Sequence, residues 1–217
     1  IGSGSGGILL TSAPAFPVLD DTHYNDLLFE AESHQGTYNN YALDFDGNND
    51  FIKINNSNDI NTGSHHTNKT IEAWFKVDNK NISSHKQTIY EQGGTVRGLN
   101  IYIFAGALYV GGWNEPESRW NPGTWLSTNS IQSNTWHHVA LTLSGGNSVS
   151  NNAFKGYLDG IQFGSGKGSK LWHHPGDVSI GRNRDTKFHS GDFGSARYFS
   201  GLIDEVRLWN TTRTGSQ

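Results

Sequence analysis

The chain has 217 residues, a net charge of −4, a charged fraction of 17% and a sequence pI near 6.2. This mildly acidic balance, with the basic residues scattered, excludes the electrostatic surface that binds nucleic acid. The lack of cysteine excludes a disulfide framework, a thiolate metal site and a cysteine nucleophile. No apolar run approaches the roughly 20 residues that span a bilayer, so we expect no membrane insertion.

Residues 1–38 differ from the rest, and we expect them to be a linker or N-terminal extension before one domain at 39–217. The opening IGSGSGG has the composition of a flexible tether, and the prolines of SAPAFP disfavour regular strands. Only Asn25–Glu32 has helical character, with Asn25 as its N-cap. A chain that begins at Ile1 and contains no methionine resembles a piece of a longer protein, with neighbouring domains covalently attached.

From Tyr41 onward, short stretches alternate apolar and polar residues and are separated by turn residues. Two of them have clear apolar faces, formed by Ile71, Ala73, Phe75 and Val77 in KTIEAWFKV and by Val139, Leu141 and Leu143 in TWHHVALTL. The other expected strands are YALDFDG and DFIKI as a first hairpin, KQTIYEQ, GLNIYIF, ALYVGGW, the hairpin FKGYLDG–IQFGSG around Asp159–Gly160, VSIGRN and GLIDEVRLWN. About a dozen short strands without helices between them predict an antiparallel β-sandwich, because parallel strands need long crossover connections.

Six stretches stand in an order that is typical of one family: LDFDGNNDFIKI, TIEAWFKV, TWHHVALTLSG, YLDGIQFGSG, VSIGRN and GLIDEVRLWN. Together they resemble the laminin-G-like domains of the concanavalin A-like lectin/glucanase superfamily, from about Tyr41 to Thr212. The resemblance implies an all-β jelly roll of two packed antiparallel sheets, usually one module of a larger secreted or cell-surface protein. Because the superfamily includes lectins, adhesion modules, carbohydrate-binding modules, hydrolases and lyases, the fold does not decide the function.

The carboxylates and histidines form no catalytic motif. Retaining glycosidases need two carboxylates about 5 Å apart; Glu115 and Glu117 have a suitable interval but stand in a loop around Pro116. His137 and His138 belong to a strand motif of the family, which favours packing over acid–base chemistry. The other adjacent histidines lack a clear zinc-ligand spacing. We therefore expect a domain that is not an enzyme.

Asp204 in GLIDEVRLWN is unexpected, because strand alternation points it inward together with Leu202, Val206 and Leu208. Burying an ionised carboxylate costs several kcal/mol unless a cation or strong donors meet it. One alternative is a β-bulge that turns Asp204 toward backbone N–H donors at the sheet edge.

The other alternative is a calcium ion, which binds six to eight oxygen ligands. Asp46 and Asp50 flank a turn with exposed carbonyls, and the first and last strands are commonly neighbours in this superfamily, where related domains often hold a structural calcium. The predicted ligands are Asp46, Asp50, Asp204 and the carbonyl of Gly47.

The tryptophans divide into two sets. Trp74, Trp136 and Trp209 stand in the family-like strand motifs, and charged residues that share a face with Trp74 and Trp209 favour cross-strand packing. The others stand in GGWNEPESRWNPGTW and LWHHPGD, outside those motifs, where loops of a rigid sandwich commonly bind ligands. Since sugars stack on aromatic rings and bond to Asn, Glu and Arg, the predicted ligand-binding residues are Trp113, Asn114, Glu117, Arg119, Trp120, Trp125 and Trp172. The alternative is that these tryptophans plug the open ends of the sandwich.

The sequence thus predicts a non-catalytic, lectin-like carbohydrate-binding module of a secreted or cell-surface protein, stabilised by calcium, with a polysaccharide or glycan as its partner. The alternative is a protein-interaction or adhesion domain of a multidomain surface protein, and a third is a hydrolase whose carboxylates are not recognised. A shallow polar site predicts weak affinity, in the micromolar to millimolar range.

Overall fold

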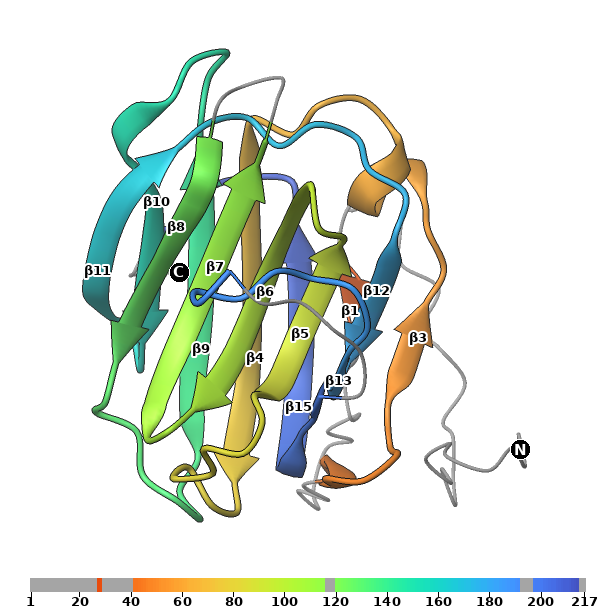
Figure 1. Cartoon of the computed structure of the whole chain (residues 1–217), viewed down its shortest axis with the longest axis vertical. Helices are drawn as coiled ribbons and strands as arrows, with labels where there is room; N and C mark the ends of the chain where they lie inside the picture. The colour runs from red at the N-terminus through yellow and green to blue at the C-terminus, as the bar shows by residue number, and fades with distance from the viewer. Residues whose placement is uncertain (1–26, 29–40, 116–119, 192–196, 215–217) are drawn as a thin grey trace, which may run out of the picture.

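The computed structural model describes residues 27–28, 41–115, 120–191 and 197–214, which form two antiparallel sheets lying one in front of the other (Figure 1). The seven-stranded sheet runs β1 (Leu27–Leu28), β15 (Ser200–Trp209), β4 (Asn68–Val77), β9 (His137–Ser144), β10 (Ser150–Leu158) and β11 (Ile161–Gly168), with β2 (Leu43–Asp46) also paired to β15. The six-stranded sheet runs β3 (Ile52–Ile54), β12 (Asp177–Ile180), β5 (Gln87–Gly93), β6 (Arg97–Phe104), β7 (Ala107–Asn114) and β8 (Trp120–Thr128). The other elements are a ribbon of β13 (Arg182–Asn183) and β14 (Arg197–Tyr198), and η1 (Asn58–Thr62), one π-helical turn. Within these residues, no helix has the length and apolar character to cross a membrane.

The core lies between the two sheets and is built by strand alternation. The inward residues predicted for β4 and β9 are all buried: Ile71, Ala73, Phe75 and Val77, and Val139, Leu141 and Leu143. The six-stranded sheet contributes Leu99, Ile101, Val110 and Val178, among others. Because successive side chains of a strand point to opposite faces, the residues between these positions are directed away from the core. The predicted all-β antiparallel sandwich is confirmed.

The hairpin predicted at Asp159–Gly160 joins β10 to β11. Both turn residues have positive φ, 50° and 79°, which is the conformation that favours Asp-Gly in two-residue hairpin loops. The Asp159 carboxylate accepts the backbone N–H of His138 at 2.8 Å and contacts Nδ1 of His137 at 2.8 Å. This turn therefore fixes the start of β9, where the two histidines lie on opposite faces of the strand.

Two predicted local elements are wrong. β2 pairs with β15 and β3 pairs with β12, so the two strands separate into the two sheets and form no first hairpin. Leu27–Leu28, inside the segment expected to be helical, is a strand whose residues lie opposite Leu208 and Arg207. β1 and β2 both pair with the edge of β15 that β4 does not occupy. This pairing explains why Leu27–Leu28 is not helical and why β2 forms no hairpin with β3.

A β-bulge in β15 explains Asp204. Glu205 has φ 47°, and the register with β4 shifts after Asp204. Ile203 takes the buried place predicted for Leu202, while Asp204 lies opposite Trp74 on the outer face and accepts the Glu205 N–H at 2.8 Å. The bulge alternative is confirmed, and the prediction that Leu202 and Asp204 face the core is wrong.

Candidate functional site

The stretch predicted as a ligand-binding loop consists largely of strands. Trp113 lies in β7 and Trp120 begins β8, and their side chains are 0% and 2% exposed. Trp113 donates its indole N–H to the Gly94 carbonyl at 3.0 Å, and Trp120 packs edge-on against Phe154 with ring centroids 5.4 Å apart. Both rings are thus covered by their neighbours in this structure. Trp120 belongs to the core between the sheets, as the plug alternative describes, whereas Trp113 packs outside that core. A ligand-binding role for either stays a prediction.

The polar residues predicted beside them do not form a described binding surface. Asn114 is fully buried and donates its Nδ2–H to the Lys170 carbonyl at 2.6 Å. This bond ties the end of β7 to the segment after β11 and gives Asn114 a structural role. Glu117 and Arg119 lie outside the described residues.

Trp125 and Trp172 are the predicted ligand residues that remain partly exposed in the structure. The Trp125 ring is stacked on Trp113 with centroids 6.0 Å apart, and Trp172 contacts the ring of His65 at 4.0 Å. The two tryptophans come from β8 and from the segment after β11, and each packs against a different neighbour. Neither tryptophan lines the two hollows described below.

The predicted calcium residues Asp46 and Asp50 lie in one turn. Asp46 Oδ1 accepts the backbone N–H groups of Asn48 and Asn49 at 2.8 and 3.1 Å, and Asp50 Oδ2 accepts the Asp46 N–H at 3.1 Å. These backbone donors lower the pKa of Asp46. Gly47 stands at the turn with φ 77°. The carboxylates thus already stabilise the turn by bonding to its amides.

Asp204 does not reach this turn. The residue opposite Asp46 in β15 is Ser200, and Asp204 lies four residues farther along, or about 13 Å at the rise of an extended strand. Among the described residues there is no group of three or more histidine or acidic side chains able to hold a metal ion. The predicted set therefore does not fit one calcium site. Stabilisation by calcium stays a prediction, which unfolding temperatures in calcium and in EDTA test.

The outer face of the seven-stranded sheet carries aromatic and charged side chains in rows that cross the strands. The first row is Asp204, Trp74 and His138; the second is Arg207, Glu72, Ala140 and Tyr157; the third is Trp209, Thr70, Thr142 and Lys155. Members of a row lie directly opposite one another on adjacent strands, so their side chains are neighbours. The small side chain of Ala140 leaves the middle of the second row open.

This open centre is part of a groove. A first hollow of about 280 Å³ is lined by Trp74, His138, Ala140 and Arg207, together with Glu72 and Tyr157. A second hollow of about 450 Å³ shares Thr142, Tyr157, Arg213 and Thr214 with the first and extends to Ser144 and Lys155. We call the two together the sheet groove. Because they share lining residues, the two hollows adjoin on the outer face of β15, β4, β9 and β10.

The segment after β15 forms one wall of the groove. Thr70 donates its hydroxyl to the Thr211 carbonyl at 2.8 Å and accepts the Arg213 N–H at 3.0 Å. Thr212 donates its hydroxyl to the Leu143 carbonyl at 2.7 Å. These bonds hold the segment across β4 and β9, and they place the Arg213 side chain beside the groove.

Glu72 organises the charged part of the first hollow. Its Oε1 accepts the Trp209 indole N–H at 2.9 Å and an Arg213 N–H at 3.2 Å, and it lies 3.9 Å from Arg207. Its Oε2 lies 3.6 Å from His138 Nε2. The Arg213 guanidinium also lies over the Trp209 ring, 4.1 Å from its centroid. The Glu72 carboxylate thus holds the guanidinium groups of Arg207 and Arg213 at the side of the first hollow.

Trp74 presents an aromatic surface to this hollow. Its side chain is 39% exposed, and its ring lies 5.3 Å from the His138 ring. Burial lowers the pKa of His138. An exposed indole beside an imidazole ring, with hydroxyl, carboxylate and guanidinium groups around them, is suited to a ligand that has both apolar C–H faces and hydroxyl groups.

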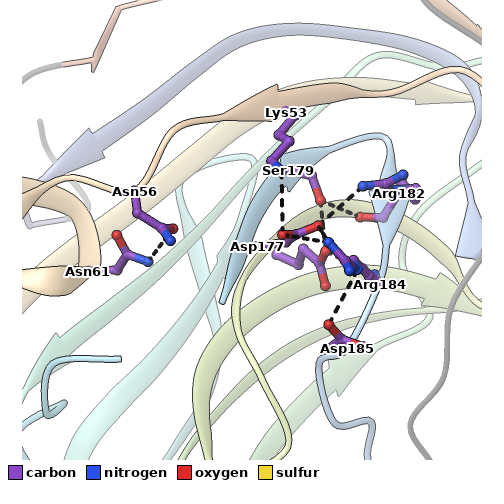
Figure 2. A network of polar contacts seen from close by, with 9 residues as sticks. Lys53, Asn56, Asn61, Asp177, Ser179, Arg182, Arg184 and Asp185 are labelled. Atoms are coloured by element: carbon purple, nitrogen blue, oxygen red, sulfur yellow. Dashed lines mark hydrogen bonds and ion pairs between the residues drawn. The ribbon is translucent and has the colours of Figure 1, made fainter. Parts of the chain in front are cut away.

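The outer face of the six-stranded sheet carries a separate polar network (Figure 2). Asp177 accepts N–H groups of Arg184 at 3.1 Å and Arg182 at 3.3 Å. Ser179 donates its hydroxyl to Glu91 at 2.7 Å, and Glu91 also accepts the Arg184 backbone N–H at 2.9 Å. The network joins β12 and β5 to the segment that starts at β13, which gives it a structural role.

The buried Glu91 carboxyl predicts a pH-dependent stability. Burial raises its pKa from 4.5 to about 7, so its contribution is present below pH 4.5 and is lost as the pH rises through 7. Glutamine does not titrate, so Glu91→Gln keeps its contribution at high pH. Relative to the natural chain, the unfolding free energy of the variant should rise by about 3 kcal/mol from pH 4 to pH 8. Urea unfolding of both proteins at the two pH values measures the change, and parallel pH profiles would contradict it.

The groove residues Trp74, His138, Tyr157, Arg207 and Arg213 are absent from the predicted ligand set. A signal for Trp74 exists in the sequence, because it alternates with the apolar residues of KTIEAWFKV and therefore occupies the outer face. An aromatic ring on the polar face of a strand can pack across strands or meet a ligand; Trp74 packs across strands against His138, as predicted, and also lines the first hollow.

Several solved structures have a similar fold. A search of curated protein sequences finds no match. Domain 4 of AbnA, a GH43 extracellular arabinanase from Geobacillus stearothermophilus solved with arabinotriose, is similar at 17% identity and a TM-score of 0.55, over 81% of this chain and 73% of that one. A putative carbohydrate binding protein from Bacteroides ovatus has 24% identity and a TM-score of 0.56, over 81% and 45% of the two chains. The CBM40 of Ruminococcus gnavus IT-sialidase, bound to α2,3 sialyllactose, has 13% identity and a TM-score of 0.57, over 81% and 92%.

The sequence family agrees with the fold. A laminin G family model matches residues 45–217, which include both sheets except β1 and the first residues of β2. With the sandwich topology and this match, the chain belongs to the concanavalin A-like lectin/glucanases superfamily.

Proposed function

We propose that the domain is a non-catalytic carbohydrate-binding module whose sheet groove holds a glycan. The exposed ring of Trp74, beside the ring of His138 in a hollow lined by hydrogen-bonding side chains, is the observation that carries the proposal. The names of three similar structures support it, since one is a putative carbohydrate binding protein and two hold arabinotriose or sialyllactose.

In this mechanism a sugar ring lies with its C–H face on the Trp74 indole, and its hydroxyl groups meet Tyr157, Thr142 and Glu72 on the groove floor. The second hollow continues the groove toward Lys155 and accommodates further sugar units of the same chain. No bond is made or broken in this role. Since the groove is open and polar, single-site affinity lies in the micromolar to millimolar range, and attachment to other domains raises the overall binding strength.

We also propose that the module works outside the cell as part of a larger protein. The arabinanase that contains a similar domain is extracellular, which supports this setting. A module that holds a polysaccharide keeps its covalently attached neighbours near that polysaccharide. Its contribution to the whole protein is then a higher local substrate or surface concentration.

Filling the groove tests the proposal. Ala140→Phe places a ring at the floor of the first hollow, so glycan binding should be lost at a temperature where urea unfolding shows the variant to be folded. The matched control is Ser127→Phe, which adds the same ring at an exposed position of β8 in the six-stranded sheet. Both variants and the natural domain are applied to a glycan array and to insoluble polysaccharides. Equal binding by Ala140→Phe and Ser127→Phe would contradict the groove as the site.

A further inference from the structure

We propose that the second hollow of the groove binds an anionic substituent of the glycan, a carboxylate or a sulfate. This inference rests on the proposed function and names the class of sugar that the groove selects. Among the described residues, the lining of the second hollow includes Lys155 and Arg213 and contains no aspartate or glutamate. Because Arg213 is paired with Glu72, the net positive charge of this hollow comes from Lys155, and it attracts an anion.

Lys155 carries a positive charge that no described acidic side chain pairs with. It lies opposite Thr142 of β9 and Ser165 of β11, and no ion pair joins its ammonium group to a described acidic residue. The acidic residues of the outer face lie in or beside the other hollow, where Glu72 contacts Arg207 and Arg213 and Glu205 contacts Arg207 at 2.8 Å. The positive charge of Lys155 therefore faces the hollow without an internal anion to neutralise it.

The remaining lining residues suit an oxyanion. Thr142 and Ser144 offer hydroxyl groups, and Asn151 and Asn152 offer amides, all of which can donate hydrogen bonds to a carboxylate or sulfate oxygen. Arg213 belongs to both hollows, and its guanidinium is held by Glu72 at 3.2 Å and by stacking on Trp209. A cation fixed in this way makes a charge-assisted bond at little cost in side-chain ordering.

In this arrangement the two hollows bind different parts of the glycan. A sugar ring stacked on Trp74 occupies the first hollow, and the anionic group of the next unit, or of the same unit, meets Lys155 in the second. Tyr157 lies between Lys155 and the first hollow, since it belongs to the lining of both. The groove thus selects acidic glycans, in which charge and an apolar ring face occur on one chain.

Pairs of glycans that differ in charge test the inference. The probes are polygalacturonate against its fully methyl-esterified form, dextran sulfate against dextran, and α2,3 sialyllactose against lactose. At least one acidic member should bind about tenfold more tightly than its neutral partner, and the difference should shrink between 50 and 500 mM NaCl because salt screens it. The pair with the largest ratio identifies a uronate, a sulfate or a sialate as the anion.

Substitutions assign the effect to the hollow. Lys155→Gln should remove most of this preference and leave binding of the neutral partner unchanged. Lys167→Gln is the matched control, because it removes the same charge from an exposed position of the neighbouring strand β11. Equal binding of both members in all three pairs, or an equal effect of the two lysine variants, would overturn the inference. Neutral glycans that bind through Trp74 would still support the proposed function in that case, whereas a domain that binds no glycan would overturn both.

Discussion

Trp74→Ala is expected to lower glycan affinity about thirtyfold while the domain stays folded. The substitution removes the exposed ring on which a sugar would stack, a loss of about 2 kcal/mol for an aromatic contact at the centre of a binding site. The ring is partly exposed and lies on the outer face, so the unfolding free energy should fall by about 1 kcal/mol or less. Isothermal titration with the best glycan of an array measures the first change, and urea unfolding measures the second.

Trp136→Ala is the matched control for this experiment. Trp136 is also 39% exposed, but it does not line the groove and contacts Lys76 at 5.9 Å instead. This variant should bind glycans as the natural domain does. If Trp74→Ala kept full affinity, or if both variants lost the same amount, the aromatic contact would lie elsewhere or the effect would be unspecific.

Trp113→Ala is expected to lower the unfolding free energy by 3–5 kcal/mol, an amount typical for removing a buried aromatic side chain. Trp113 is fully buried, packs on Trp125 and donates its indole N–H to the Gly94 carbonyl. Truncation removes the packing against Trp125 and leaves the Gly94 carbonyl without its indole donor. Urea unfolding measures the loss, and a linear extrapolation gives the free energy if the transition is two-state.

Trp113→Phe separates packing from ligand contact. The phenyl ring fills part of the space, so this variant should be destabilised less than Trp113→Ala. Both variants should keep the glycan affinity of the natural domain, measured at a temperature where they are folded. A Trp113→Ala domain of normal stability that had lost glycan binding would return Trp113 to the ligand-binding role first predicted for it.

The strands could be predicted from the sequence because each inner face alternates regularly. KTIEAWFKV and TWHHVALTL lie in adjacent strands with the predicted residues inward, and Asp159–Gly160 forms the predicted turn. Long-range pairing was harder to predict. The bulge at Glu205 inverts the alternation of β15, and β2 forms no hairpin with β3, since a local pattern does not state which distant strand completes a ladder. The pairing of β2 with β15 agrees with the neighbouring first and last strands that the family resemblance implies.

The burial of two of the predicted ligand-binding tryptophans has a different physical reason. Trp113 and Trp120 are buried because glycines make room for them. A Cβ at Gly98 would lie 2.7 Å from the Trp113 ring, and a Cβ at Gly112 would lie 2.5 Å from the Trp120 ring. Neither glycine is near its tryptophan in an obvious sequence pattern, because the contacts cross from strand to strand. A tryptophan count in a loop-like stretch therefore cannot separate a plug from a ligand platform.

The groove itself depends on contacts that are distant in sequence. Trp74, Ala140 and Tyr157 come together through the order β4, β9, β10, and Arg213 reaches them because Thr70 bonds to Thr211 and Arg213 in the returning segment. Strand alternation in the sequence predicts that Trp74 lies on the outer face. Only the order and register of the paired strands show that Ala140 lies near Trp74 and leaves a hollow there.

The most direct test is an NMR titration of the seven tryptophan indole N–H signals, assigned by single substitutions, with the tightest glycan found on the array. The groove predicts that the signals of Trp74 and Trp209 move with glycan concentration, while those of Trp113 and Trp120 stay in place. Movement confined to Trp125 and Trp172, with Trp74 unchanged, would contradict the groove and place the glycan at the residues first predicted from the sequence.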